Sequence, residues 1–146
     1  MDEVFERADF LALNCPLTDD TRHVANARTL ALMKPTAFLI NTSRGPVVDQ
    51  TALFDALVAG RIAGAGLDVF DPEPPAPDDP ILALDNVIVA PHSLGWTDQM
   101  FGRMAEVNMA AVHDVLAGRN PDNVVNPDVL DRPGFKAKLT GLAGGD

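Results

Sequence analysis

The sequence predicts an α/β fold built on a parallel β-sheet of about four strands, with helices on both faces. Short runs that are apolar throughout alternate with segments whose apolar residues recur at helical spacing. Strands without polar alternation are typical of parallel sheets that are covered on both faces. In addition, the polar residues of interest directly follow the predicted strands, at the edge where open α/β sheets bind ligands.

The first strand–helix repeat lies in the N-terminal quarter of the chain. Residues 2–8 have the spacing of a short helix, and the apolar run of residues 10–13 predicts the first strand. Asn26 is a suitable N-cap for a helix that ends before Pro35, and a second strand begins at Phe38.

The second repeat follows the same logic. Asp49 can cap a helix that Gly60 ends, and residues 62–70 form a third strand. Residues 64–66, Gly-Ala-Gly, look like the start of a nucleotide-binding fingerprint. However, they lie inside the strand, and Val69 occupies the position of its last glycine. We expect these glycines to allow close packing of a neighbouring helix.

The second half of the chain, from residue 71, differs in composition from the first. The proline-rich and acidic residues 71–80 predict an ordered loop, and residues 87–90 a fourth strand. A long helix runs from Thr97 to Gly118, and the tail from Asn120 is expected to be extended before a last short turn.

Composition and charge restrict the function classes. The 146 residues, 47% apolar and 22% charged, suit one folded domain. A net charge of −10 disfavours nucleic acid and anionic membrane partners. The single cysteine, Cys15, excludes an internal disulfide and a thiolate zinc pair, so no metal site is predicted. Without a signal peptide or a long apolar run, the expected location is the cytoplasm.

Three residues at the predicted strand ends could form an acid–base centre. Arg44 follows the second strand, and its guanidinium can hold a carboxylate through two parallel hydrogen bonds. Glu73 and His92 follow the third and fourth strands, and a carboxylate beside an imidazole orients the ring. Each residue alone has a purely structural explanation, whereas their common position at one sheet edge favours a site.

Four motifs follow one another along the chain: Cys15-Pro16-Leu17-Thr18, Asn41-Thr42-Ser43-Arg44-Gly45, Gly66-Leu67-Asp68-Val69-Phe70 with Glu73-Pro74, and Pro91-His92. Together and in this order they resemble those of a known family, the D-isomer-specific 2-hydroxyacid dehydrogenases. The resemblance extends from about residue 2 to residue 127. It implies a Rossmann-like sheet and an enzyme that transfers a hydride between a nicotinamide cofactor and a small 2-keto or 2-hydroxy acid.

The resemblance also implies individual roles. Arg44 would bind the carboxylate and keto oxygen of the substrate, His92 would donate the proton, and Glu73 would pair with His92. Asp68 would hold the carboxamide side of the nicotinamide. The residues implied in cofactor binding are Cys15, Pro16, Thr21, Asn41, Thr42, Ser43, Asp68, His92 and Gly95. The cofactor is NAD or NADP, with NAD favoured, and the full-length form would be a homodimer.

The chain also departs from the family pattern. It has no glycine fingerprint for the pyrophosphate and no substrate domain. We therefore expect residues 1–96 to be the C-terminal half of the cofactor-binding domain. Residues 97–146 would return to the missing substrate domain, and the fragment alone would be inactive. The alternative is a non-catalytic nucleotide-sensing or interaction module with the same fold, which would need none of Arg44, Glu73 and His92.

Overall fold

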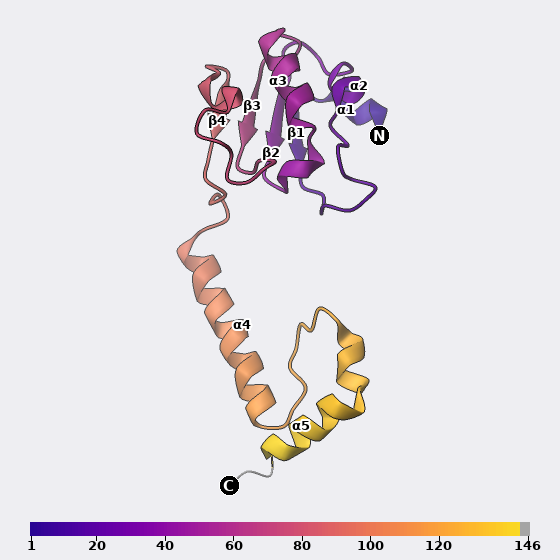
Figure 1. Ribbon diagram of the computed structural model, residues 1–146, viewed down its shortest axis with the longest axis vertical. Coiled ribbons are helices and arrows are strands. Elements are labelled where there is room, and N and C mark those ends of the chain that lie inside the picture. Colours follow the sequence, from indigo (N-terminus) through magenta and orange to yellow (C-terminus); the bar gives the residue numbers. More distant parts are fainter. Residues whose placement is uncertain (144–146) are drawn as a thin grey trace. The chain divides into compact units, whose positions relative to one another are not determined.

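The computed structural model describes residues 1–143 and divides the chain into two compact units (Figure 1). The first unit is Met1–Gly95 and holds the sheet, and the second unit begins at Trp96 and contains helices in its described residues. Among the described residues, no helix combines the length and the apolar character needed to cross a membrane.

In the described part of the chain, the first unit contains one parallel sheet of four strands (Figure 1). Its strands lie side by side in chain order: β1 (Phe10–Leu13), β2 (Phe38–Asn41), β3 (Gly64–Leu67) and β4 (Val87–Val89). The predicted α/β class with a parallel sheet is confirmed. Because all the strands run the same way, their carboxyl ends meet at one edge of the sheet.

Helices α1 (Asp2–Arg7), α2 (Ala27–Leu30) and α3 (Gln50–Val58) complete the first unit. As predicted, Asn26 and Asp49 are the N-caps of α2 and α3, and Gly60 follows α3 with a φ of 62°. Helix α2 is shorter than predicted. After Leu30, the amides of Leu32 and Met33 bond three residues back, which tightens the chain and ends the α-helix.

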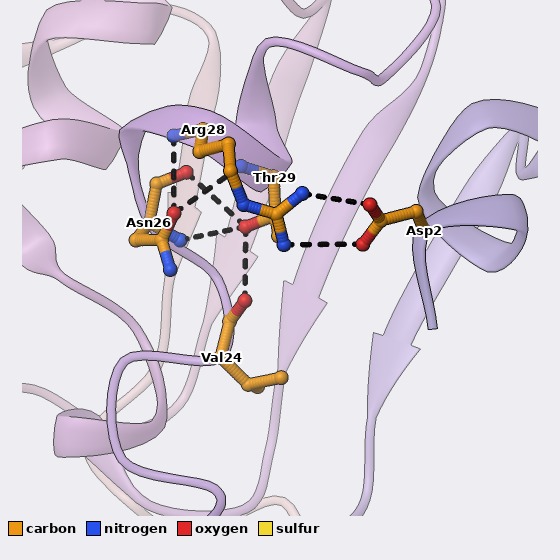
Figure 2. Close-up of polar contacts among 5 residues, drawn as sticks. All are labelled: Asp2, Val24, Asn26, Arg28 and Thr29. Carbon is orange, nitrogen blue, oxygen red and sulfur yellow. Dashed lines mark hydrogen bonds and ion pairs between the residues drawn. The ribbon is translucent and has the colours of Figure 1, made fainter.

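The start of α2 shows how a local cap and a distant contact combine (Figure 2). The Asn26 side chain accepts from the amides of Arg28 and Thr29, and the Thr29 hydroxyl accepts from the Asn26 amide, which makes a capping box. Arg28 also donates to both carboxylate oxygens of Asp2 in α1, at 2.7 and 3.1 Å. This ion pair is exposed, so it orients α1 more than it stabilises the fold.

Within the first unit, helices cover only one face of the sheet. On that face Leu39 and its neighbours pack with Leu30 of α2 and Leu53 of α3 into a single core. The other face leaves Phe10 71% and Ile88 79% exposed. The prediction of helices on both faces was therefore wrong for this unit. Right-handed crossovers between strands in consecutive order all fall on the same side, and only a reversal of strand order changes sides.

The glycines of β3 leave room for residues of the neighbouring strands and not for a helix. A Cβ at Gly64 would lie 2.5 Å from the Asn86 carbonyl oxygen and 3.0 Å from the Phe38 ring. At Gly66 it would meet only the Ile40 side chain. The expectation of close helix packing at these glycines was wrong, because on this face the space is taken by neighbouring strand residues.

The second unit contains α4 (Asp98–Leu116), a 3₁₀ turn (Pro127–Asp131) and α5 (Pro133–Ala143). The long helix predicted from Thr97 is present as α4, and the Thr97 side chain caps it by accepting from the Met100 amide. The tail was expected to end in a short turn, but α5 has 11 residues. Pro133 is the first helical residue, where its fixed φ favours a helix, so it begins the helix instead of preventing it.

Candidate active site

The carboxyl edge of the sheet collects the polar residues that follow the four described strands. The β2 loop contains Arg44, the β3 loop contains Asp68 and Glu73, and the β4 loop contains His92. The β1 loop contains Cys15. Since β1 and β4 are the two outer strands of this sheet, the Cys15 loop lies at the opposite end of the edge from His92.

The turn that carries Arg44 is held by the side chain of Asn41, the last residue of β2. The Asn41 side-chain oxygen accepts from the Ser43 amide at 3.1 Å and from the Ser43 hydroxyl at 2.8 Å. Its amide nitrogen donates to the Arg44 carbonyl at 3.0 Å. Asn41 is buried, so this side chain fixes the turn from inside and leaves Arg44 exposed at the surface.

Gly45 joins the Arg44 turn to the loop that carries Glu73. A Cβ at Gly45 would lie 1.7 Å from the Phe70 carbonyl oxygen and 2.8 Å from the Asp71 nitrogen, so only glycine fits at this contact. The adjacent Arg44 guanidinium donates to the Ser43 carbonyl at 2.6 Å. Two loops that are remote in the sequence are thus fixed against each other, with an arginine beside the junction.

Glu73 and His92 form a direct pair. Nδ1 of His92 lies 2.5 Å from Oε1 of Glu73, and Oε2 of Glu73 accepts from the Phe70 amide at 3.2 Å. The hydrogen bond to His92 is the main cause that lowers the pKa of Glu73, assisted by the Phe70 amide and by the charges of His92 and Arg44. Partial burial of the carboxylate opposes this shift.

This pairing indicates which ring nitrogen of His92 carries a proton. A carboxylate only accepts hydrogen bonds, so we assign the proton to Nδ1 of His92. Nε2 is then the ring nitrogen that Glu73 does not use. The side chains of His92 and Glu73 are 44% and 36% exposed, so a small molecule can reach the pair.

Asp68 lies behind the pair at the end of β3 and is only 4% exposed. Its Oδ1 accepts from the Ser93 amide at 2.9 Å, and its Oδ2 from the Leu94 amide at 3.2 Å. His92, immediately before these two residues, has a φ of 54°.

A cavity of about 480 Å³ opens beside the pair. It is mostly apolar, and Arg44 is not among its lining residues. The lining consists of Asp68, Phe70, Glu73, Pro74, Pro75, Leu82, Val89, Ala90, Pro91 and His92. The structure thus brings Glu73, His92 and Asp68 to one cavity and places Arg44 next to the loop that forms part of its wall.

The other residues implied in cofactor binding occupy the loops after β1, β2 and β4. The Thr21 hydroxyl donates to the Pro16 carbonyl at 2.6 Å and accepts from the Thr18 amide at 2.8 Å, so it organises its own loop. Cys15 is half-buried, whereas Pro16 is exposed. Thr42, Ser43 and Gly95 are exposed or half-buried at the carboxyl edge.

Gln50 was missed by the sequence reasoning. It is the first residue of α3; its side-chain oxygen accepts from the Asp71 amide at 3.1 Å, and its nitrogen donates to Asp79 at 2.8 Å. Gln50 therefore ties both ends of the proline-rich loop around Glu73. A glutamine at a helix start has no distinctive sequence signal, so only the fold reveals this function.

Comparisons with known proteins were made against family models, curated sequences and solved structures. Residues 1–93 match the family model described as D-isomer specific 2-hydroxyacid dehydrogenase, NAD binding domain. The chain is 46% identical over 138 residues to a glyoxylate reductase of Korarchaeum cryptofilum, and this match covers 93% of the chain and 42% of the relative. The chain thus spans about two fifths of the length of such relatives.

Solved structures give the same result for the fold. A protein from Thermus thermophilus is 44% identical with a TM-score of 0.81, covering 85% of this chain and 40% of its own. The NAD complex of a D-isomer specific 2-hydroxyacid dehydrogenase from Lactobacillus delbrueckii ssp. bulgaricus is 32% identical. Its TM-score is 0.77, and the match covers 85% of this chain and 42% of that one. These similarities also support the Rossmann-like form of the sheet.

Proposed function

Because the chain belongs to the D-isomer specific 2-hydroxyacid dehydrogenase family through its NAD binding domain, we propose that it supplies the acid–base half of an NAD-dependent oxidoreductase. The reaction interconverts a small 2-keto acid and the corresponding 2-hydroxy acid. The observation that carries the proposal is the 2.5 Å contact between Nδ1 of His92 and Oε1 of Glu73 at the carboxyl edge of the sheet.

The contact defines how the proton moves. Glu73 accepts the hydrogen bond from Nδ1 of His92 and thereby fixes the orientation of the ring, which leaves Nε2 for the substrate. Nε2 then carries the proton that passes to the keto oxygen of the substrate, and in the reverse direction it accepts the hydroxyl proton. The nicotinamide, when bound, supplies or accepts the hydride.

Arg44 is proposed to bind the substrate. An exposed guanidinium beside the Glu73 loop can hold the carboxylate of a keto acid bidentately. Its charge also favours electron density on the keto oxygen as the hydride arrives. The curated relative described above is a glyoxylate reductase, so the proposed substrates are glyoxylate and similar small 2-keto acids.

The described residues fit the nicotinamide end of the cofactor better than its pyrophosphate. The N-termini of α2 and α3 are already closed by Asn26 and Asp49, and the Asp49 carboxylate would repel a phosphate. We therefore propose that this chain contacts the nicotinamide and its ribose, and that the rest of the full protein holds the phosphates. The proposed contacts are Cys15, Pro16, Thr21, Asn41, Thr42, Ser43, Asp68, His92 and Gly95.

The alternative, a nucleotide-sensing module without catalysis, does not require Glu73 and His92 to be paired or the Glu73 loop to be fixed by Gln50 and Gly45. The choice between NAD and NADP, the homodimer and the cytoplasmic location stay predictions from the sequence and the family resemblance.

The test is a hybrid enzyme in which this chain replaces the matching segment of the Korarchaeum cryptofilum relative. NADH oxidation is followed at 340 nm with glyoxylate as substrate. We expect turnover in the hybrid and a loss of about 10²- to 10⁴-fold in His92→Asn, which removes the proton donor. His113→Asn is the matched control, because His113 is exposed on α4 and its ring hydrogen-bonds to Arg119. Equal rates in His92→Asn and the control would refute the assigned function.

A further inference from the structure

Asp68 is a buried carboxylate that hydrogen-bonds, within the described residues, to β2 and to the loop after His92. Its two oxygens accept from the Ser93 and Leu94 amides, as described above. Its own amide donates to the Asn41 carbonyl at 3.0 Å, which fixes the Asp68 backbone to β2. A buried charge is tolerated only where hydrogen bonds compensate for the lost water, so these two backbone donors are required where they are.

The backbone of His92 needs such support. Its φ of 54° lies in the left-handed region, which a residue with a Cβ adopts reluctantly. Two residues before it, the Ala90 amide donates to the Leu67 carbonyl at 2.8 Å. His92 is thus held on both sides by the end of β3, through Leu67 before it and through Asp68 after it.

We propose that Asp68 is the positioning residue of the Glu73–His92 pair. By accepting the Ser93 and Leu94 amides, its carboxylate holds His92 in the left-handed conformation, which directs the ring to Glu73. This role rests on the proposed function for its catalytic importance, whereas the structural link itself is measurable without turnover. It is also compatible with a contact to the nicotinamide, because each carboxylate oxygen can accept a second hydrogen bond.

Asp68→Asn replaces one of the two carboxylate oxygens by an NH₂ group with almost no change in the shape of the side chain. The amide side chain has one accepting oxygen, and its NH₂ group points a donor at one of the two backbone amides. One hydrogen bond is lost and the loop is released on that side. Asp49→Asn is the matched control, because Asp49 also accepts a backbone amide, at 3.1 Å, but at the start of α3, where asparagine caps equally well.

The first measurement is NMR on the full 146-residue chain. In Asp68→Asn we expect the Ser93 and Leu94 amides to exchange with solvent at least tenfold faster. We also expect the Glu73 carboxyl carbon to titrate at higher pH, because the hydrogen bond from His92 that lowers its pKa is weakened. The Asp49→Asn control should leave both quantities unchanged. An unchanged Glu73 titration in a folded Asp68→Asn chain would overturn the proposal.

If Asp68→Asn does not fold, Asp68→Glu decides. This variant keeps the charge and both oxygens but moves them by one methylene, so the proposal still requires the Glu73 titration to shift. A titration like that of the wild type would show that only the charge matters and would overturn the positioning role.

The hybrid enzyme separates this proposal from the proposed function. A positioning role lowers kcat in Asp68→Asn by a larger factor than it raises the Kd for NADH. A larger loss of NADH affinity with unchanged kcat would assign Asp68 to cofactor binding and overturn the positioning role. If the hybrid is inactive throughout, the proposed function fails, and the NMR result still decides whether Asp68 positions His92.

Discussion

Gly45→Ala tests how the Arg44 turn is fixed to the Glu73 loop. The added Cβ would lie 1.7 Å from the Phe70 carbonyl oxygen, whereas carbon–oxygen contacts are ordinarily no closer than about 3.3 Å. One of the two loops must therefore move by about 1.6 Å. Both contacting groups are backbone, so no side-chain rotation can relieve the clash, in contrast to most substitutions that overpack a core.

The expected cost follows from this geometry. Overpacking costs about 1–3 kcal/mol where side chains can adjust, so we expect about 3 kcal/mol or more here. For a unit of the size of Met1–Gly95, each kcal/mol lowers the Tm by about 4–8 °C, which gives a loss of about 12–24 °C for unfolding of that unit. In the hybrid enzyme, a displacement of Arg44 by about 1 Å or more should lower the rate by about 10²-fold.

The assay is urea and thermal unfolding followed by circular dichroism, with Gly60→Ala as control. Gly60 has a φ of 62° but no atom within 4 Å of an added Cβ, so alanine there costs only the left-handed backbone strain, about 1–2 kcal/mol. If Gly45→Ala loses no more stability than Gly60→Ala, the proposed junction between the two loops is refuted.

Three further predictions concern the acid–base pair, the substrate and the cofactor. In the hybrid enzyme, Arg44→Lys should lower kcat/KM for glyoxylate at least tenfold although the charge is kept, because lysine cannot form the bidentate contact; wild-type kinetics would contradict this. The pKa of Glu73 is lowered in the folded state, so its contribution to stability is present above the ordinary glutamate value of about 4.3 and is lost as the pH falls through the lowered value. Urea unfolding between pH 6 and pH 3 should therefore show wild type losing stability relative to Glu73→Gln in that acidic range, and a constant difference would argue against the pairing. Finally, the 146-residue chain alone should bind NADH weakly and transfer no hydride, since α2 and α3 offer no phosphate site; tight stoichiometric binding in a fluorescence titration would favour the nucleotide-sensing alternative.

Local chemistry made much of the fold predictable from the sequence. The caps Asn26, Asp49 and Thr97 act on amides two or three residues away, so their positions can be read from the chain directly. The strands were recognisable because β1 is a short apolar run followed by Asn14, and β2 is an apolar run that ends in Asn41.

The errors arose where distant segments decide the outcome. Which face of the sheet the helices cover depends on strand order and crossover handedness, and the periodicity of α2 and α3 contains neither. For the same reason, the clamp that Gln50 and Gly45 form around the Glu73 loop could not be predicted. The proximity of Glu73 and His92, by contrast, followed from their places after adjacent parallel strands.

A double-mutant cycle in the hybrid enzyme tests most directly whether Glu73 acts through His92. The rates of Glu73→Gln, His92→Asn and the double variant are compared with the parent hybrid under saturating NADH and glyoxylate. Residues that act as one unit are strongly non-additive, so the double variant should be no slower than His92→Asn alone. Losses that multiply, with the double variant slower by the full factor of Glu73→Gln, would contradict the pairing as the basis of catalysis.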